Sequence, residues 1–500
     1  MEFLEPILAL ATPPGRAGIA VLRLSGSGLC TWLPEAFGWK GEAPAKGLRR
    51  IVDARGALID QVLVLSFRAP GSFTGEDAIE LHCHGSPVVV EELFERLLEL
   101  GRGWGLRLAR PGEFSQRAFL NGRIDLAQAE ALADLIASET VLQARAAARA
   151  MQGDLSARVN CLLESVQGLR LLVEAALDFP EEPVESLASW GLDEALAKCA
   201  EDLQRELPAF KRGAMLQQGL RIALIGPPNV GKSSLLNALS GKDLAIVDTE
   251  PGTTRDRIEQ AIDLGGFRVI VTDTAGIRNR EEAGRIESLG IERSWQAAAE
   301  ADLVLLMTSA ERAQAWAGAE LDDWPQRFEA EAFDWFRLHC PSESAQGAIA
   351  SILVVVNKAD LLPAESRMRL LDAISKPKTA RGPYGPLVLC STRAAEDADP
   401  LPDTALRIGC EALIARLRSI LGLEHDRADP LIARARHVDA LERALMHVES
   451  AAAFWRATAG QADLMAEELR LAQRALGEIT GIWSDEELLG EIFGRFCIGK

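Results

Sequence analysis

The segment LRIALIGPPNVGKSSLLNALSG, residues 220–241, decides the fold of the central part of the chain. An apolar run leads into the loop GPPNVGKSS, Gly226 to Ser234, and a helical pattern follows. Strand, glycine loop and helix in this order are what a phosphate-binding P-loop requires. Backbone N–H groups of such a loop turn toward phosphate oxygens at a helix N-terminus, which favours negative charge. The segment predicts a nucleotide-binding domain; a chance glycine loop is the alternative.

Apolar runs alternate with helical patterns from Leu220 to about Leu421. The runs are apolar throughout, as in strands that are covered on both faces. They are RVIVTDTAG (268–276), DLVLLMT (302–308), SILVVVNKAD (351–360) and PLVLCST (386–392). This alternation predicts a doubly wound, mostly parallel sheet. We interpret the Trp-rich, acidic segment 309–350 as an insertion or an extended helix.

Three motifs follow the P-loop in the order that GTPases use. Asp273, in DTAG, ends a predicted strand, where it can hold Mg²⁺ through water while the N–H of Gly276 meets the γ-phosphate. Asp360, in NKAD, can accept hydrogen bonds from the ring N–H and the amino group of guanine. Adenine lacks this donor pair, and unpaired buried polar groups are costly. The loop 391–393 fits a backbone contact with the guanine carbonyl, so the motifs together predict a GTPase.

The predicted nucleotide site also includes the segment AIVDTEPGTTRD, residues 245–256. Lys232 would reach the β- and γ-phosphates, and Ser233 would bind Mg²⁺. Thr254 would close on Mg²⁺ and the γ-phosphate only in the GTP state, although a threonine-rich surface loop is the alternative. The predicted GTP-binding residues are Asn229, Val230, Gly231, Lys232, Ser233, Ser234, Asp248, Thr249, Glu250, Pro251, Gly252, Thr253, Thr254, Asp273, Thr274, Ala275, Gly276, Asn357, Lys358, Ala359, Asp360, Ser391, Thr392 and Arg393.

Length and composition limit the class of protein. A chain of 500 residues is expected to form about two to four domains. Its formal net charge of -19 argues against a general polyanion binder. The eight cysteines include no CxxC pair, which disfavours a disulfide framework or structural zinc. Without a secretory signal or a long apolar run, we expect a cytoplasmic protein with no membrane contact.

The regions on either side of the GTPase segment differ in their predicted secondary structure. Residues 1–121 combine predicted strands (17–24, 61–67 and 78–84) with a helix that ends at Gly101, as in an α+β domain.

Residues 122–216 and 423–500 are helical in pattern. Asp125 and Gln128 form a capping box, and Pro180 and Pro183 break the first helical region. In the second, an apolar stripe comprises Leu469, Ala472, Leu476 and Ile479, and Ser484 with Glu487 forms another capping box. We therefore predict a multidomain chain: an N-terminal α+β domain (1–121), a discontinuous all-α domain (122–216 and 423–500) and an inserted α/β P-loop GTPase domain of the Ras-like type (217–422).

Several segments outside the GTPase motifs resemble the MnmE (TrmE) family of tRNA-modification GTPases over nearly the whole chain. They are ATPPGRAGIAVLRLSG (11–26), SFTGEDAIELHCHG (72–85), ARPGEFSQRAFLNGRIDLAQAEALADLI (109–136), EELRLAQRALGEITG (467–481) and FCIGK (496–500). The resemblance implies that two GTPase domains meet across their nucleotide faces. It also implies a potassium ion beside the P-loop, with Asn229 as ligand and carbonyls around Asp248, Glu250 and Thr253.

The residue after DTAG is Ile277, which cannot orient a water molecule. The resemblance assigns that role to Glu287, three residues before the run GIER, with Glu281 and Glu282 as alternatives. A solvated carboxylate at a helix start would also explain Glu287.

For the N-terminal domain the resemblance implies permanent dimerisation and binding of 5-formyl-tetrahydrofolate or a related folate. The matching positions are Arg23, Glu80, Arg123 and, in the tail, Lys500. Without the resemblance each would be an ordinary surface charge. The resemblance also implicates Cys497 in activity, so the predicted catalytic residues are Glu287, Lys232 and Cys497. His82 and His84 alternate on one strand face, but two ligands without a third are weak evidence for a metal.

The family's function is modification of carbon 5 of the wobble uridine in certain tRNAs with an aminomethyl or carboxymethylaminomethyl group. The implied partner is the FAD- and NADH-using protein MnmG (GidA), in a heterotetramer or larger complex. No GxGxxG follows a predicted strand, so we expect FAD only on that partner. Two alternatives are a GTP-controlled RNA-binding or ribosome-assembly GTPase, and a folate-dependent one-carbon enzyme that GTP regulates.

Overall fold

The computed structural model describes residues 5–39, 46–178, 191–227, 229–239, 258–264, 266–273, 301–310, 352–361, 365, 387–389, 410–420, 431–457, 462–483, 486–496 and 499. The chain forms two compact units. The first comprises Met1–Ala137, Ala147–Ala209 and Ala435–Lys500, and the second comprises Ser138–Ala146 and Phe210–Arg434. No helix among these described residues combines the length and apolar character of a membrane span.

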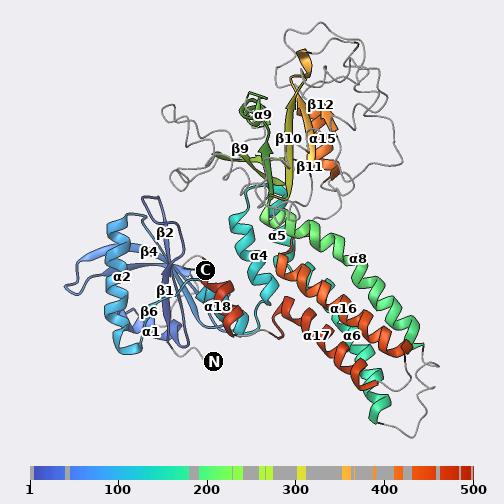
Figure 1. Ribbon diagram of the computed structural model, residues 1–500. Helices are drawn as coiled ribbons and strands as arrows, with labels where there is room; N and C mark the ends of the chain where they lie inside the picture. Colours follow the sequence, from blue (N-terminus) through green and yellow to red (C-terminus); the bar gives the residue numbers. More distant parts are fainter. Residues whose placement is uncertain are drawn as a thin grey trace, which may run out of the picture. The chain divides into compact units, whose positions relative to one another are not determined.

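A six-stranded sheet forms the N-terminal part of the first unit (Figure 1). In spatial order its strands are β3 (Lys46–Val52), β4 (Leu58–Phe67), β5 (Ala78–Cys83), β2 (Ala20–Ser25), β1 (Ile7–Leu10) and β6 (Arg107–Leu108). Neighbouring strands are antiparallel, except that β1 and β6 are parallel. Helices α1 (Leu29–Ala36) and α2 (Pro87–Gly101) pack on one face, around Leu22, Leu24, Ile79 and Leu81.

The predicted strands of this sheet are confirmed, but three others were not predicted. β1 has only four residues, β6 only two, and β3 carries three charged side chains at the edge of the sheet. Such short or charged edge strands lack the alternation of apolar and polar residues from which strands are predicted. The α2 helix does end at Gly101, and one 3₁₀ turn, Arg102–Trp104, continues it.

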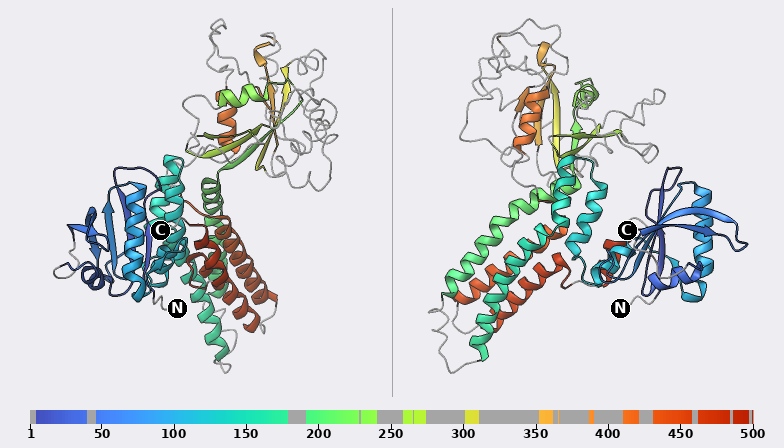
Figure 2. Two further views of the ribbon diagram at one scale, coloured as in Figure 1. Left: turned by 90° about the vertical axis from the view of Figure 1, so that its left-hand side faces the viewer. Right: turned by 180° about the vertical axis from the view of Figure 1, so that it is seen from behind.

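Helices make up the rest of the first unit. They are α3 (Glu113–Leu120), α4 (Leu126–Ala137), α6 (Asp154–Asp178), α16 (Ala435–Ala457), α17 (Ala462–Thr480) and α18 (Glu486–Gly494), while α5 (Val141–Met151) and α8 (Leu192–Gln218) extend into both units. α17 packs against α16 and α6, which lie side by side with it in Figures 1 and 2. Helices from both sides of the α/β region therefore share one core.

Two sequence features of these helices are confirmed. The predicted stripe on α17, Leu469, Ala472, Leu476 and Ile479, is completely buried. The capping box is also present, because the Asp125 N–H donates to Gln128 Oε1 at 2.9 Å and the Gln128 N–H to Asp125 Oδ1 at 2.8 Å. The predicted break at Pro180 and Pro183, and the second box at Ser484 and Glu487, lie outside the described residues.

A buried ion cluster joins α4 to α16. Arg436 donates from Nε to Glu130 Oε1 at 2.8 Å and from Nη2 to Glu130 Oε2 at 2.6 Å. Nε2 of His437 lies 2.9 Å from the same Oε2. Burial opposes ionisation of Glu130, but the hydrogen bonds from His437 and Arg436 lower its pKa to about 2. The cluster thus links residues 306 positions apart in the chain.

The second unit contains a six-stranded sheet. Its spatial order is β12 (Leu387–Leu389), β11 (Ile352–Asn357), β10 (Leu303–Ser309), β7 (Leu220–Ile225), β9 (Arg268–Asp273) and β8 (Ile258–Asp263). All neighbours are parallel except β8, which pairs antiparallel with β9. This confirms the predicted mostly parallel sheet; β8 was not predicted. The segment interpreted as an insertion lies outside the described residues beyond residue 310.

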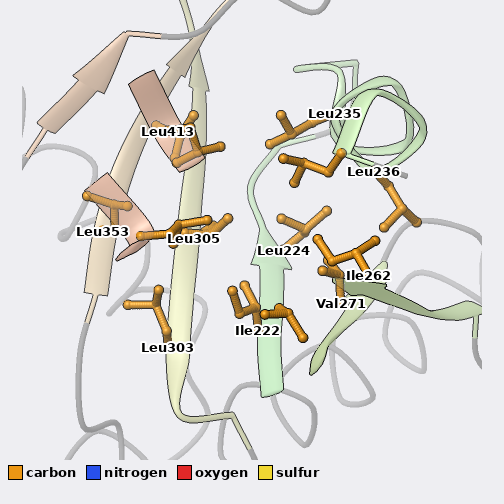
Figure 3. Packing of buried hydrophobic residues seen from close by; sticks show 14 of the residues in the cluster. Ile222, Leu224, Leu235, Leu236, Ile262, Val271, Leu303, Leu305, Leu353 and Leu413 are labelled. Atoms are coloured by element: carbon orange, nitrogen blue, oxygen red, sulfur yellow. The ribbon is translucent and has the colours of Figure 1, made fainter. Parts of the chain in front are cut away.

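Two helices cover one face of this sheet. α9 (Lys232–Leu239) follows the P-loop, and α15 (Cys410–Ile420) comes from much later in the chain. Figure 3 shows Leu235 and Leu236 of α9 and Leu413 of α15 pointing toward Leu224 and Leu305 of the sheet. Burial of these side chains fixes the start of α9, and hence the P-loop, against the end of β7.

The β8–β9 turn contacts the chain between α4 and α5 within the second unit. Thr140 Oγ1 donates to the Gly266 carbonyl at 2.6 Å, and Arg268 Nε lies 2.8 Å from Glu139 Oε2. Gly266 has a φ of +98°, and a Cβ there would lie 2.7 Å from Leu142 Cβ. The close approach therefore depends on a glycine in this turn.

Candidate functional sites

The P-loop leaves the carboxyl end of β7, between β10 and β9. Asp273 ends β9 and Asn357 ends β11, and these strands are parallel to their neighbours in the order β11-β10-β7-β9. The carboxyl ends of parallel strands lie at the same edge of a sheet. Ligands bind at that edge, in the crevice where the connections from two neighbouring strands leave in opposite directions. Three of the predicted motifs are thus brought to one edge.

Lys232 is enclosed by the loop that precedes it. The residue is 7% exposed, and its Nζ donates to the carbonyls of Gly226 at 2.7 Å and Pro227 at 3.0 Å. Lys232 is the first residue of α9, so the dipole of this helix and the Lys232 ammonium both place positive charge at the P-loop. This arrangement suits the β- and γ-phosphates of a nucleotide.

Asn357 connects the base-recognition motif to the P-loop. It is completely buried, and its Nδ2 donates to the Val230 carbonyl at 2.8 Å. Its Oδ1 has no hydrogen-bond partner among the described residues. A Cβ at Gly231 would lie 2.4 Å from Nδ2, so a side chain there would displace the amide. Buried acceptors normally have partners, which makes this one a candidate for contact with a bound nucleotide or a neighbouring loop.

Two residues of this region adopt the left-handed backbone conformation. Asn229 has a φ of 65° and Lys358 a φ of 62°. Asparagine tolerates this conformation, whereas a long side chain such as lysine adopts it at a cost. Such strain is characteristic of functional loops that the surrounding structure holds in place.

The structure brings together one part of the predicted nucleotide site. Residues 229–234 and 357–360 lie in the described region, and Asp360 is exposed there. For Asp273 the backbone is described at the end of β9. The remaining predicted residues lie outside the described residues: Asp248, Thr249, Glu250, Pro251, Gly252, Thr253, Thr254, Thr274, Ala275, Gly276, Glu281, Glu282, Glu287, Ser391, Thr392 and Arg393.

A second polar site lies on the N-terminal sheet. Arg23 of β2 is directly opposite Glu80 of β5, with Nε 2.9 Å and Nη2 2.8 Å from Oε1. The Arg23 guanidinium also lies 5.9 Å from the centroid of the Phe114 ring. Its Nη1 donates to the carbonyl of Gly499 at 3.4 Å, and Gly499 is buried against the Leu10 carbonyl. The C-terminal tail is therefore docked at the Arg23–Glu80 pair.

The other predicted folate residues have different outcomes. Arg123 is exposed, and its side-chain stem lies against Gly75. Among the described residues, Arg123 makes no contact with Arg23 or Glu80. Cys497 and Lys500, on either side of Gly499, lie outside the described residues.

A buried charge network lies on the Phe114 side of this site and was missed in the sequence. Arg117 is completely buried and contacts Glu113 Oε1 at 2.9 Å and Glu76 Oε2 at 3.0 Å. Arg107 contacts the same Glu113 oxygen at 2.6 Å. Burial opposes ionisation of Glu113, but these hydrogen bonds and that of the Arg110 N–H lower its pKa to about 2. The i,i+4 spacing of Glu113 and Arg117 was the available signal.

The two histidines of β5 and its end have separate partners. His82 Nε2 lies 3.2 Å from Glu80 Oε2. His84 Nδ1 lies 2.8 Å from Asp60 Oδ1, and the His84 N–H donates to Asp60 Oδ2 at 2.9 Å. Burial opposes ionisation of Asp60, but the hydrogen bonds from His84 lower its pKa. The structure thus pairs each histidine with its own carboxylate, not with the other histidine.

Comparison with known proteins identifies relatives over the whole chain. The model of the MnmE helical domain matches residues 126–497, and that of the GTP-binding protein TrmE N-terminus matches residues 6–123. The tRNA modification GTPase MnmE of Cupriavidus metallidurans is 41% identical over 495 residues, which cover 99% of each chain. That of Leptothrix cholodnii is 42% identical over 515 residues, again 99% of each chain. That of Azoarcus sp. is 43% identical over 497 residues, 99% of this chain and 98% of its own.

Proposed function

Because the chain belongs to the MnmE family of tRNA-modification GTPases, we propose that its GTP hydrolysis serves modification of carbon 5 of the wobble uridine. The chain is a GTP-binding hydrolase that takes part in tRNA modification. The group added would be aminomethyl or carboxymethylaminomethyl, with the carbon supplied by a formylated tetrahydrofolate. The partner would be the FAD- and NADH-using MnmG, which would hold the flavin.

The nucleotide site supports the first half of this proposal. Lys232, enclosed by P-loop carbonyls, and Asn357, tied to Val230, fit a guanine nucleotide that lies between them. Ser233 and Thr254 would hold Mg²⁺, which would supply positive charge at the phosphates. The left-handed backbone at Asn229 fits a loop that turns this side chain toward a second cation.

A potassium ion would offset the charge that develops on the transferred phosphate. Asn229 would be its side-chain ligand, with carbonyls around Asp248, Glu250 and Thr253. Glu287 would orient the attacking water, the role for which Ile277 is unsuited. Two GTPase domains of a homodimer would meet across this face.

The docking of the tail at the N-terminal sheet carries the second half of the proposal. Arg23 contacts both the Glu80 carboxylate and the backbone carbonyl of Gly499, so groups from the two ends of the chain share one polar site. A carboxylate and a guanidinium suit the N–H donors of a pterin and the anionic tail of a folate. Cys497 and Lys500 are near Gly499 in sequence and would border this site, and Arg123, whose stem lies against Gly75, would complete it.

The proposal is tested by wobble-nucleoside analysis together with cation dependence. Deletion of the gene should remove the modified wobble nucleoside from a digest of total tRNA, and Arg23→Ala should reproduce the loss. A ribosome-assembly GTPase would leave the digest unchanged, which would contradict the proposal. GTP turnover of the purified chain should be at least about tenfold faster in KCl than in NaCl. Asn229→Ala should abolish this difference; equal turnover of wild type in both salts would refute the potassium site.

A further inference from the structure

We propose that His82 is a positioning residue, which holds the Glu80 carboxylate in the orientation that receives the 2-amino group of the bound pterin. This inference rests on the proposed folate site and extends it by one residue. The evidence lies in the strand register, in the division of the two Glu80 oxygens between two side chains, and in the exposure of the group.

The strand register places His82 beside Glu80. β2 and β5 are antiparallel, with Arg23 opposite Glu80 and Val21 opposite His82. Side chains two residues apart on a strand share one face of the sheet. The alternating residues Ile79, Leu81 and Cys83 are buried in the core under α1 and α2. Glu80 and His82 therefore share the other face with Arg23.

Each oxygen of Glu80 is held by a different side chain. Both contacts of Arg23, at 2.8 and 2.9 Å, are with Oε1. Oε2 is contacted by His82 Nε2 at 3.2 Å. An ionised carboxylate only accepts hydrogen bonds, so this contact requires the proton on Nε2 of His82. Two anchoring points fix the plane of the carboxylate, whereas Arg23 alone would let Oε2 swing about Oε1.

Among the contacts of the described residues, the Glu80 carboxylate keeps one acceptor position for a ligand donor. Two oxygens offer about four acceptor positions, of which Arg23 takes two and His82 takes one. The side chain of Glu80 is 18% exposed, that of His82 26% and that of Arg23 29%, so the group is partly open to solvent. The remaining acceptor position on Oε2 would receive the 2-amino group of the pterin. His82 sets the direction of that position.

A binding experiment on the full chain separates this role from a general effect on folding. Isothermal titration would use 5-formyl-tetrahydrofolate and an analogue that lacks the 2-amino group. His82→Ala should raise the dissociation constant for the first ligand about 10- to 150-fold, the effect of losing one hydrogen bond to a charged group. His82→Gln, which keeps an N–H donor, should restore affinity to within about threefold of wild type.

The neighbouring histidine provides the matched control. His84 contacts Asp60 and not Glu80, and its side chain is 75% exposed. His84→Ala should bind both ligands as wild type does. The analogue should bind His82→Ala and wild type equally well, because it lacks the donor that Glu80 receives.

The possible outcomes distinguish two failures. If wild type binds neither ligand, the folate proposal is wrong and His82 has no such role. If wild type binds folate and Glu80→Ala weakens it while His82→Ala does not, the positioning role alone is wrong. Equal weakening of both ligands by His82→Ala would indicate a distorted sheet and would also overturn the inference.

Discussion

The side-chain amide of Asn357 donates a 2.8 Å hydrogen bond to the carbonyl of Val230, across 127 positions of sequence. Asn357→Asp would place a carboxylate against that carbonyl in a fully buried position. We expect GDP and GTP affinity to fall at least about tenfold, because a buried hydrogen bond is replaced by repulsion between two acceptors. Titration with a fluorescent guanine nucleotide measures the affinity, and thermal unfolding measures the accompanying loss of stability.

Asp360→Asn is the control for Asn357→Asp. Asp360 is exposed and belongs to the same motif, so its replacement should weaken GTP binding through the base alone. Xanthine carries an oxygen where guanine has its amino group, so Asp360→Asn should favour XTP while its melting temperature stays unchanged. If Asn357→Asp kept both wild-type affinity and melting temperature, the Asn357–Val230 hydrogen bond would have no energetic importance.

The buried Glu130 should make the first unit sensitive to acid. Its pKa falls from 4.5 to about 2 on folding, so the unfolded chain binds more protons between these pH values. Stability from this group is complete above about pH 5 and is lost as pH falls toward 2. The difference in pKa corresponds to about 3 kcal/mol of unfolding free energy at neutral pH. Urea unfolding of wild type between pH 7 and pH 3 should show a falling midpoint.

Glu130→Gln should lower stability at pH 7 by about 3 kcal/mol, because the partly exposed Arg436 and the buried His437 would both lose the carboxylate that they contact. The variant should also lose the part of the acid sensitivity that Glu130 causes. Glu467 is a suitable control, because its pKa is also lowered by Arg470, but the pair is exposed on α17. Glu467→Gln should leave the urea midpoint nearly unchanged. Equal acid sensitivity of Glu130→Gln and wild type would contradict the assignment.

Gly266 should be intolerant of even one added methyl group. Gly266→Ala would place a Cβ 2.7 Å from that of Leu142, at a φ of +98°. We expect a loss of about 1–3 kcal/mol in unfolding free energy of the second unit. Chemical denaturation followed by fluorescence measures it. At Gly18 a Cβ meets nothing within 4 Å, so Gly18→Ala should behave as wild type. A wild-type stability for Gly266→Ala would show that the turn readily moves away from Leu142.

The nucleotide-binding sheet was largely predictable from the sequence, because its central strands are buried on both faces. All five apolar runs of the central region form strands. β8 was not predicted because Ile258–Asp263, at the edge of the sheet, mixes polar with apolar residues and lacks the continuous apolar character of the other strands. The P-loop was predictable because its motif is local, and its geometry follows from adjacent residues.

The polar site on the N-terminal sheet was less predictable. Arg23 and Glu80 were singled out by resemblance only, and their direct contact depends on a register between strands 57 positions apart. His82 was considered for metal binding, because the sequence shows its alternation with His84 but not the separate carboxylate that each one contacts. Long-range register is set by packing of the whole sheet, so no local pattern could supply it.

The contact between Glu130 and Arg436 also constrains the order in which the protein is made. Glu130 leaves the ribosome 306 residues before the guanidinium that it contacts in the finished bundle. At about 5–20 residues per second, the delay is about 15–60 seconds, long enough for the intervening α/β unit to be synthesised. The ion cluster of Glu130 with Arg436 and His437 can therefore form only late in biosynthesis, after the intervening α/β unit has been made.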